Sequence, residues 1–141
     1  MKLDCSHDIS IRVRYSETDR MGYCYHGNYA TYFEIGRVEA LRAIGVVYKS
    51  LEDQGILLPV VSLEINYKLP AKYDDLLRLK TSLTGIGAST LSFEYQLFNQ
   101  DEALLTTGKT TLVFVNSTTA KPIRIPEWIL LQLLPYEINT Q

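Results

Sequence analysis

The residues best suited to take part in a reaction lie together in one short segment, residues 15–29. Within it, the carboxylate of Asp19 follows an expected strand, and a His26-Gly27-Asn28 turn leads into an expected helix. The first turn of a helix carries backbone N–H groups without partners inside the helix, together with partial positive charge. A carboxylate beside such donors suits attack on a carbonyl whose oxygen becomes negative as the reaction proceeds.

Two interpretations of Asp19 follow from the spacing alone. In the first, the carboxylate caps or closes a turn, as aspartates in loops often do. In the second, it acts on a substrate carbonyl as a nucleophile, or on water as a general base. Gly22, Gly27 and the start of the expected helix follow within nine residues of Asp19, and these neighbours favour the second interpretation.

His26 and Asn28 also have structural and functional interpretations. The His26 ring either packs at the helix entrance against a backbone carbonyl, or contacts substrate and orients water. In the second case the His26 backbone N–H also points at the substrate carbonyl. Asn28 is expected to be the helix N-cap, and a cap fixes where the free N–H groups point.

Glu34 and Cys24 complete the candidates. Glu34 falls one to two turns into the expected helix, on the side of Asn28, where it could face a substrate. Cys24 would need a partner base to act as a nucleophile. His26 is two residues away, and side chains at that spacing do not generally face each other. A small buried residue is therefore the simpler interpretation of Cys24.

The periodicity predicts the elements that hold these residues. Residues 9–15 alternate apolar and polar, as a half-buried strand does, and residues 29–44 have the apolar spacing of a helix that stops at Gly45. Residues 48–54 predict a short second helix, and Pro126 opens a last one. Four further strands are predicted over residues 57–69, 76–83, 90–98 and 103–115. One long helix against an antiparallel sheet is an α+β architecture.

The composition sets the class of protein. The chain has 141 residues, of which 46% are hydrophobic and 21% charged, as expected for one globular domain. Its formal net charge of −2 gives no basic surface for nucleic acid. No apolar run is long enough to span a membrane, and the N-terminus lacks an apolar signal core, which favours the cytoplasm. Cys5 and Cys24 are too few for a disulfide framework or a usual zinc site.

Residues 16–22, 25–29 and 32–37 resemble the active-site signature of the 4-hydroxybenzoyl-CoA thioesterase family of hotdog-fold proteins. From Asp19 the signature reads Asp-x-x-Gly-x-x-Tyr-His-Gly-Asn-Tyr. The likeness is greatest to the acyl-CoA thioesterase branch associated with the bacterial Tol-Pal system. It implies a single domain over residues 1–141, with a core of about 9–130.

The resemblance implies a fold and a reaction. The fold is a five-stranded antiparallel sheet wrapped around one long central helix, assembled into homodimers or homotetramers with active sites at subunit interfaces. The reaction is hydrolysis of acyl-CoA thioesters, with no metal and no cofactor, because CoA is part of the substrate. By position, Asp19 matches the catalytic carboxylate, and His26 matches the residue whose backbone N–H binds the thioester carbonyl. Tyr25, Gly27, Asn28 and Glu34 are the substrate-binding candidates.

The sequence departs from the family pattern at two places. Tyr23 and Cys24 stand where many relatives have small aliphatic residues, which predicts a reshaped acyl pocket. Gly87 stands where relatives often carry an arginine that meets a CoA phosphate. The candidates that replace this arginine are Lys68, Lys72, Arg78 and Lys80. Two alternatives therefore accompany the CoA thioesterase: a thioesterase acting on acyl-carrier protein, and a hotdog domain that binds acyl thioesters or proteins without turnover.

Overall fold

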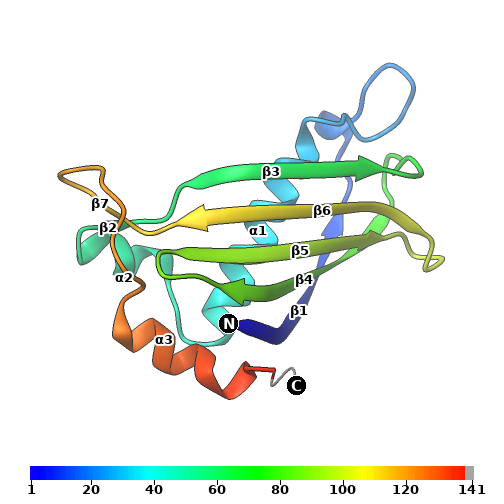
Figure 1. The fold of residues 1–141 in the computed structure, drawn as a ribbon. Helices are drawn as coiled ribbons and strands as arrows, with labels where there is room; N and C mark the ends of the chain where they lie inside the picture. Colours follow the sequence, from blue (N-terminus) through cyan, green and yellow to red (C-terminus); the bar gives the residue numbers. More distant parts are fainter. Residues whose placement is uncertain (139–141) are drawn as a thin grey trace.

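The computed structural model describes residues 1–138. Five strands form one antiparallel sheet in the order β1-β4-β5-β6-β3 (Figure 1). These strands are β1 (Lys2–Arg12), β4 (Leu76–Ile86), β5 (Thr90–Phe98), β6 (Leu104–Val113) and β3 (Val60–Tyr67). A separate two-stranded sheet pairs β2 (Ile56–Leu57) with β7 (Val115–Asn116). The predicted five-stranded antiparallel sheet is confirmed.

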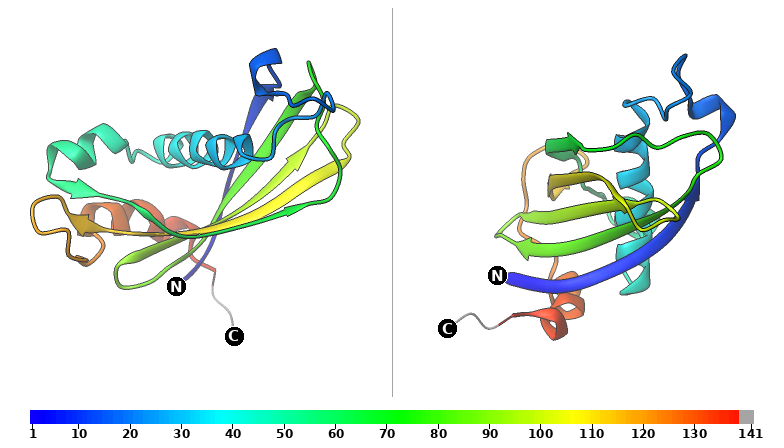
Figure 2. Two further views of the ribbon diagram at one scale, coloured as in Figure 1. Left: turned by 90° about the horizontal axis from the view of Figure 1, so that it is seen from above. Right: turned by 90° about the vertical axis from the view of Figure 1, so that its right-hand side faces the viewer.

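Helix α1 (Asn28–Ala43) has 16 residues and lies across one face of the curved sheet, where it packs against β1 and β4 (Figure 2). Phe33 of α1 stacks on Tyr95 of β5 with ring centroids 4.2 Å apart. Gly36 lets the helix approach β4 closely, because a Cβ there would overlap Oγ1 of Thr81 and lie 2.7 Å from Cδ2 of Leu79. The backbone of Gly36 thus packs directly on these two side chains, which sets the distance between α1 and the sheet.

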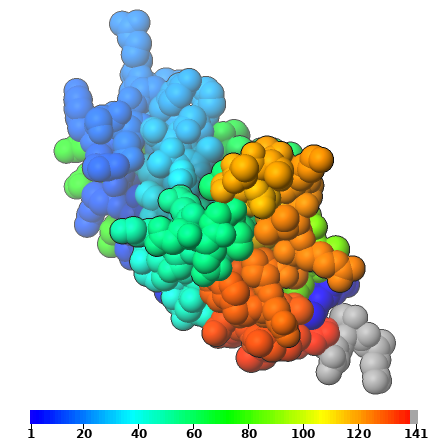
Figure 3. Space-filling model, turned by 90° about the vertical axis from the view of Figure 1, so that its left-hand side faces the viewer, coloured from blue at the N-terminus to red at the C-terminus, as the bar shows by residue number. Residues whose placement is uncertain are grey.

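Shorter helices complete the fold. They are η1 (Tyr15–Glu17), which lies beside the start of α1, and α2 (Tyr48–Asp53), α3 (Glu127–Leu133) and η2 (Leu134–Tyr136). Helices α2 and α3 lie together at the end seen in Figure 3, where the indole N–H of Trp128 donates to Oε1 of Gln54 at 3.1 Å. Helix α3 begins after Pro126, as predicted. Among residues 1–138, no helix is both long and apolar enough to cross a membrane.

Strand β1 begins earlier than the sequence pattern predicts, at Lys2 rather than Ile9. It pairs with β4 along its length, with an irregularity between Lys2 and Cys5. Buried or half-buried and exposed residues still alternate throughout β1, but the polar run Ser6-His7-Asp8 hides this alternation in the sequence. Because Leu3 and Cys5 are buried, the core extends beyond the expected start at residue 9.

Strand β3 is an edge of the sheet and is only partly covered. Helix α1 lies nearest to β1 and β4, at the opposite side of the sheet, and its first turn reaches the end of β3 through the contact of Tyr29 with Tyr67. Apolar side chains of β3 therefore stay exposed, including Val61 at 60% and Leu63 at 47%. A long edge strand with apolar side chains and unpaired backbone groups is a surface that proteins normally cover.

Candidate active site

The entrance of helix α1 differs in one detail from the prediction. The helix begins at Asn28, and Gly27 is its N-cap, without a side-chain hydrogen bond to the helix. The prediction of Asn28 as the N-cap is therefore wrong. Its Nδ2 instead donates to the backbone oxygen of Glu17 at 2.7 Å, since Gly27 has already entered the helical region. Asn28 thus ties the preceding loop to the first turn of α1.

Two backbone donors stand free at this entrance. Among the hydrogen bonds of residues 1–138, neither the N–H of His26 nor that of Gly27 has an acceptor. The carbonyls on both sides of His26 are occupied: Tyr25 O accepts from the N–H of Asn28 at 2.9 Å, and His26 O accepts from the hydroxyl of Tyr67 at 3.1 Å. The turn therefore offers donors to a ligand while its acceptors are held within the protein.

Asp19 closes its own turn with one carboxylate oxygen. Its Oδ1 accepts from the N–H of Met21 at 2.9 Å and from that of Tyr23 at 3.2 Å. Gly22, with φ of +75°, supplies the left-handed residue of this turn. The turn-closing interpretation is therefore correct as geometry. Within the described residues, Oδ2 accepts no hydrogen bond and remains available.

Asp19 and His26 line the same cavity, of about 280 Å³, between the 19–26 loop and the end of β3. Its complete lining comprises Asp19, Met21, Tyr23, Cys24, His26, Tyr29, Tyr67, Lys68, Leu69 and Pro70. One carboxylate, one imidazole and one ammonium thus meet a wall that is otherwise aromatic, aliphatic or neutral. This is the arrangement expected of a small-molecule site with a few directing polar groups.

The other predicted site residues lie outside this lining. Tyr25 is exposed, and its ring packs on that of His26 with centroids 4.4 Å apart. A Cβ on Gly27 would lie 2.7 Å from Cε2 of Tyr25, so glycine there allows the ring to fold over the turn. The side chain of Asn28 binds the preceding loop at Glu17 instead. Glu34 is exposed on α1 and is not brought to the cavity.

A buried carboxylate supports the loop from beneath. Oε1 of Glu17 accepts from the backbone N–H of Arg14 at 2.8 Å, and Oε2 lies 3.1 Å from the Arg14 guanidinium. Burial opposes ionisation of Glu17, but the hydrogen bonds from Arg14 outweigh it, and the pKa of Glu17 is lowered. Glu17 also receives Asn28 and the N–H of Tyr25 on its backbone oxygen. The loop and the helix entrance thus share one support.

Cys24 is buried, as its simpler interpretation predicts. Its Sγ lies 3.4 Å from the hydroxyl of Tyr32, and burial raises the pKa of the thiol. Burial likewise raises the pKa of Tyr29 to about 12, so this cavity residue is neutral at pH 7. Neither side chain is therefore poised as an anionic nucleophile.

The four basic residues that are candidates for binding CoA phosphates differ in whether they lie at the cavity. Arg78 is engaged, with its guanidinium 3.2 Å from Asp8 and 2.6 Å from Glu102. Lys80 lies on the outer face of the sheet, and Lys68 is the one of the four that lines the cavity. The fourth, Lys72, is exposed beside the loop.

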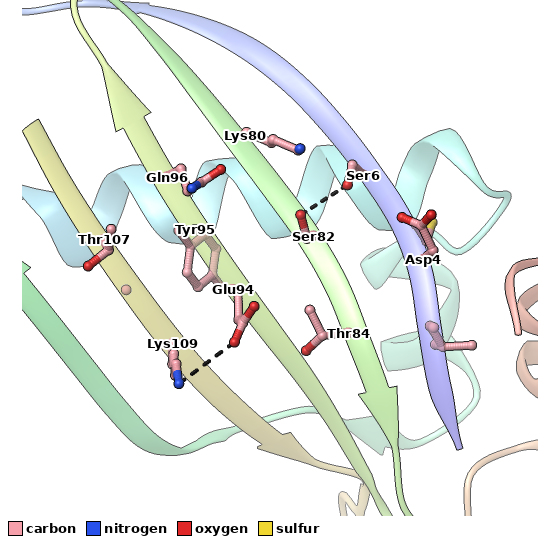
Figure 4. A pocket seen from close by; sticks show the side chains of 13 residues that line it. Asp4, Ser6, Lys80, Ser82, Thr84, Glu94, Tyr95, Gln96, Thr107 and Lys109 are labelled. Carbon is pink, nitrogen blue, oxygen red and sulfur yellow. Dashed lines mark hydrogen bonds and ion pairs between the residues drawn. The ribbon is translucent and has the colours of Figure 1, made fainter. Parts of the chain in front are cut away.

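The outer face of the sheet carries a second hollow, of about 430 Å³ (Figure 4). Two pairs of its polar side chains contact each other: the hydroxyls of Ser6 and Ser82 are 3.0 Å apart, and Lys109 lies 3.7 Å from Glu94. It lacks the combination found at the helix entrance, where an available carboxylate oxygen accompanies free backbone donors. The smaller cavity is therefore the better candidate site.

Tyr67 is the residue at this cavity that sequence reasoning missed. Its position at the end of a predicted strand and close to Pro70 was visible in the sequence. The pattern does not tell which end of that strand reaches the helix entrance, because this depends on strand order. Among residues 1–138, no group of three or more His, Cys, Asp or Glu side chains is arranged to hold a metal ion.

Comparisons with known proteins agree with this fold. Residues 13–133 match the Thioesterase-like superfamily. The acyl-CoA thioesterase YbgC of Haemophilus influenzae is 32% identical over 126 residues, which cover 89% of this chain and 92% of that protein. The acyl-CoA thioester hydrolase YbgC of Escherichia coli is 29% identical over 119 residues, with 84% and 89% covered. A crystal structure of DHNA-CoA thioesterase from Staphylococcus aureus has a TM-score of 0.84 and 38% identity, covering 87% of this chain and 85% of that one.

A five-stranded antiparallel sheet with a helix on one face is the fold of a hotdog-type protein. The chain belongs to the Thioesterase-like superfamily. The resemblance stated from the sequence is thus confirmed at the level of the superfamily.

Proposed function

We propose that this chain hydrolyses acyl-CoA thioesters to a free acid and a thiol. The observation that carries the proposal is the meeting of Asp19 and His26 at one cavity, where the backbone N–H groups of His26 and Gly27 are free. Relatives named as acyl-CoA thioesterases, which align over most of their length with this chain, support the same reaction.

In the proposed reaction, the thioester carbonyl lies at the entrance of α1. Its oxygen accepts from the N–H of His26, with Gly27 as a second donor, and these donors stabilise the negative charge that develops there. Asp19 attacks the carbonyl carbon, which expels the thiolate and leaves an anhydride that water then hydrolyses. Alternatively, Asp19 takes a proton from a water molecule that attacks directly. Both routes end in a carboxylate and a thiol.

The variant Asp19→Asn tests this proposal. The asparagine Oδ1 can still accept from Met21 and Tyr23, so the turn keeps its hydrogen bonds. We expect turnover to fall by at least ~10² because the base or nucleophile is lost. Asp101→Asn, on an exposed hairpin turn, is the matched control. Full turnover of Asp19→Asn across a panel of acyl-CoAs would contradict the proposal. Single turnover in heavy-oxygen water separates the two routes, since label enters Asp19 only after nucleophilic attack.

We further propose that the acyl group is aromatic. Three tyrosines, Tyr23, Tyr29 and Tyr67, line the cavity and offer faces and edges to a ring. The relative from Staphylococcus aureus, named a DHNA-CoA thioesterase, supports this class of substrate. Initial rates over aromatic, short aliphatic and long aliphatic acyl-CoAs test it. We expect the highest kcat/KM for an aromatic acyl group, and a preference for aliphatic chains would contradict the proposal.

CoA is the favoured thiol carrier. Lys68 at the cavity offers a cation to a CoA phosphate, although Gly87 replaces the arginine of relatives. The absence of that arginine is the feature that keeps a carrier-protein substrate as the second candidate. Hydrolysis rates of the same acyl group on CoA and on acyl-carrier protein distinguish the two, and Lys68→Gln should raise KM for the CoA ester alone.

We also propose that the chain assembles with a second copy through the edge strand β3, with α1 as the central helix of each hotdog unit. The exposed apolar side chains Val61 and Leu63 support this, because a sheet edge of this length invites pairing. Tyr67 lies at the end of the same strand and lines the cavity. The proposed assembly therefore brings the second copy close to the proposed active site.

A further inference from the structure

We infer that Tyr67 is a positioning residue that holds the backbone donors of the helix entrance in place. This inference rests on the proposed function, for which those donors bind the thioester oxygen. Tyr67 is the last residue of β3, and its side chain is about half exposed, at 52%. Its hydroxyl nevertheless donates to the backbone oxygen of His26 at 3.1 Å, across 41 positions of sequence.

The hydrogen bond acts on the peptide that joins His26 to Gly27. Because a trans peptide is planar, the direction of the His26 carbonyl fixes that of the Gly27 N–H on the opposite side. The preceding peptide is held as well, since Tyr25 O accepts from the N–H of Asn28 at 2.9 Å. Both peptides around His26 are thus clamped through their oxygens, and both of their N–H groups are left free.

The same bond also strengthens the donor. A carbonyl that accepts a hydrogen bond polarises its peptide, and the N–H at the other end becomes a better donor. The ring of Tyr67 is fixed independently, edge to face with Tyr29 at a centroid distance of 5.2 Å and with His26 at 6.3 Å. Removal of the hydroxyl alone therefore leaves the ring contacts in place.

Tyr67→Phe tests the inference, with Tyr136→Phe as the control, since Tyr136 lies on η2 away from the cavity. The loss of one neutral hydrogen bond predicts a fall in kcat of about 3- to 10-fold. We expect KM to be little changed, because the donors act mainly on the charge of the transition state. An unchanged kcat with a raised KM would overturn the inference, since Tyr67 would then contact substrate directly.

A second measurement does not depend on turnover. In the nitrogen–proton correlation spectrum of the free protein, Tyr67→Phe should move the Gly27 amide proton upfield, while Tyr136→Phe leaves it in place. An unmoved Gly27 amide would overturn the inference even if turnover falls. A fully active Asp19→Asn, in contrast, would defeat the proposed function and leave the spectral result to stand on its own, so the two failures are distinguishable.

Discussion

The two interpretations of Asp19 are compatible within one side chain. One carboxylate oxygen closes the turn by accepting from Met21 and Tyr23, and the other has no partner among the described residues. The sequence identified this residue because a carboxylate, two glycines and a helix start lie close together. Which of its two oxygens closes the turn and which stays available depends on the backbone path of the turn, and the residue types do not specify this path. The same limit explains why Asn28 was predicted as the cap and Gly27 takes that place.

At the scale of the residue, we predict that Cys24 is dispensable for covalent catalysis. Burial raises the pKa of its thiol, and its neighbour at 3.4 Å is the Tyr32 hydroxyl rather than a base. Cys24→Ala should keep turnover within about tenfold of the parent, whereas loss of a covalent nucleophile costs on the order of 10⁶. Steady-state kinetics together with a melting curve check this. A well-folded but inactive Cys24→Ala would contradict it.

At the scale of the element, the loop before α1 depends on Glu17. Its carboxylate accepts hydrogen bonds from Arg14, and its backbone oxygen accepts from Asn28, so Glu17 links η1 to the helix entrance. The sequence pattern did not reveal it, because a glutamate in a polar loop normally faces solvent. The strands and the long helix were predictable from their periods. The start of β1 at Lys2 was not, because the polar run Ser6-His7-Asp8 hides the alternation of its first residues.

We predict a pH-dependent contribution of Glu17 to stability. Its pKa is lower in the folded protein than its ordinary value of 4.5, so the unfolded chain binds more protons at acidic pH. Glu17 therefore stabilises the fold above about pH 4.5, and this contribution is lost as the pH falls through the folded-state pKa. The difference in free energy of unfolding between the parent and Glu17→Gln should shrink from pH 7 to pH 3 in urea titrations. Glu127→Gln, an exposed helix position, is the control, and a constant difference for Glu17→Gln would contradict the prediction.

At the scale of the whole molecule, the sheet is wider than the helix that covers it. Helix α1 lies over β1 and β4, and the β3 side of the same face is left with exposed apolar side chains. The sequence predicted both the sheet and the helix. It could not predict this offset, because the offset depends on strand order and on the close approach at Gly36.

We predict that β3 mediates self-association. Leu63→Lys places a charge on the exposed edge strand and should shift the protein toward monomer, because a buried unpaired charge is costly. Leu131→Lys is the matched control, since Leu131 is similarly exposed on α3. Sedimentation velocity over a range of concentrations measures the distribution. An unchanged sedimentation coefficient for Leu63→Lys, or a monomeric parent, would contradict the prediction.

The hydrogen bond from Tyr67 gives the edge strand a further consequence. It joins the end of β3 to the peptide that carries a donor of the helix entrance, so fraying of the strand would also loosen this donor. Edge strands fray more readily than central ones, and a neighbour that pairs with β3 would suppress this fraying. Thermodynamic linkage then works in both directions. Association at β3 should tighten the hold on a ligand at the helix entrance, and a bound ligand should strengthen association by the same factor.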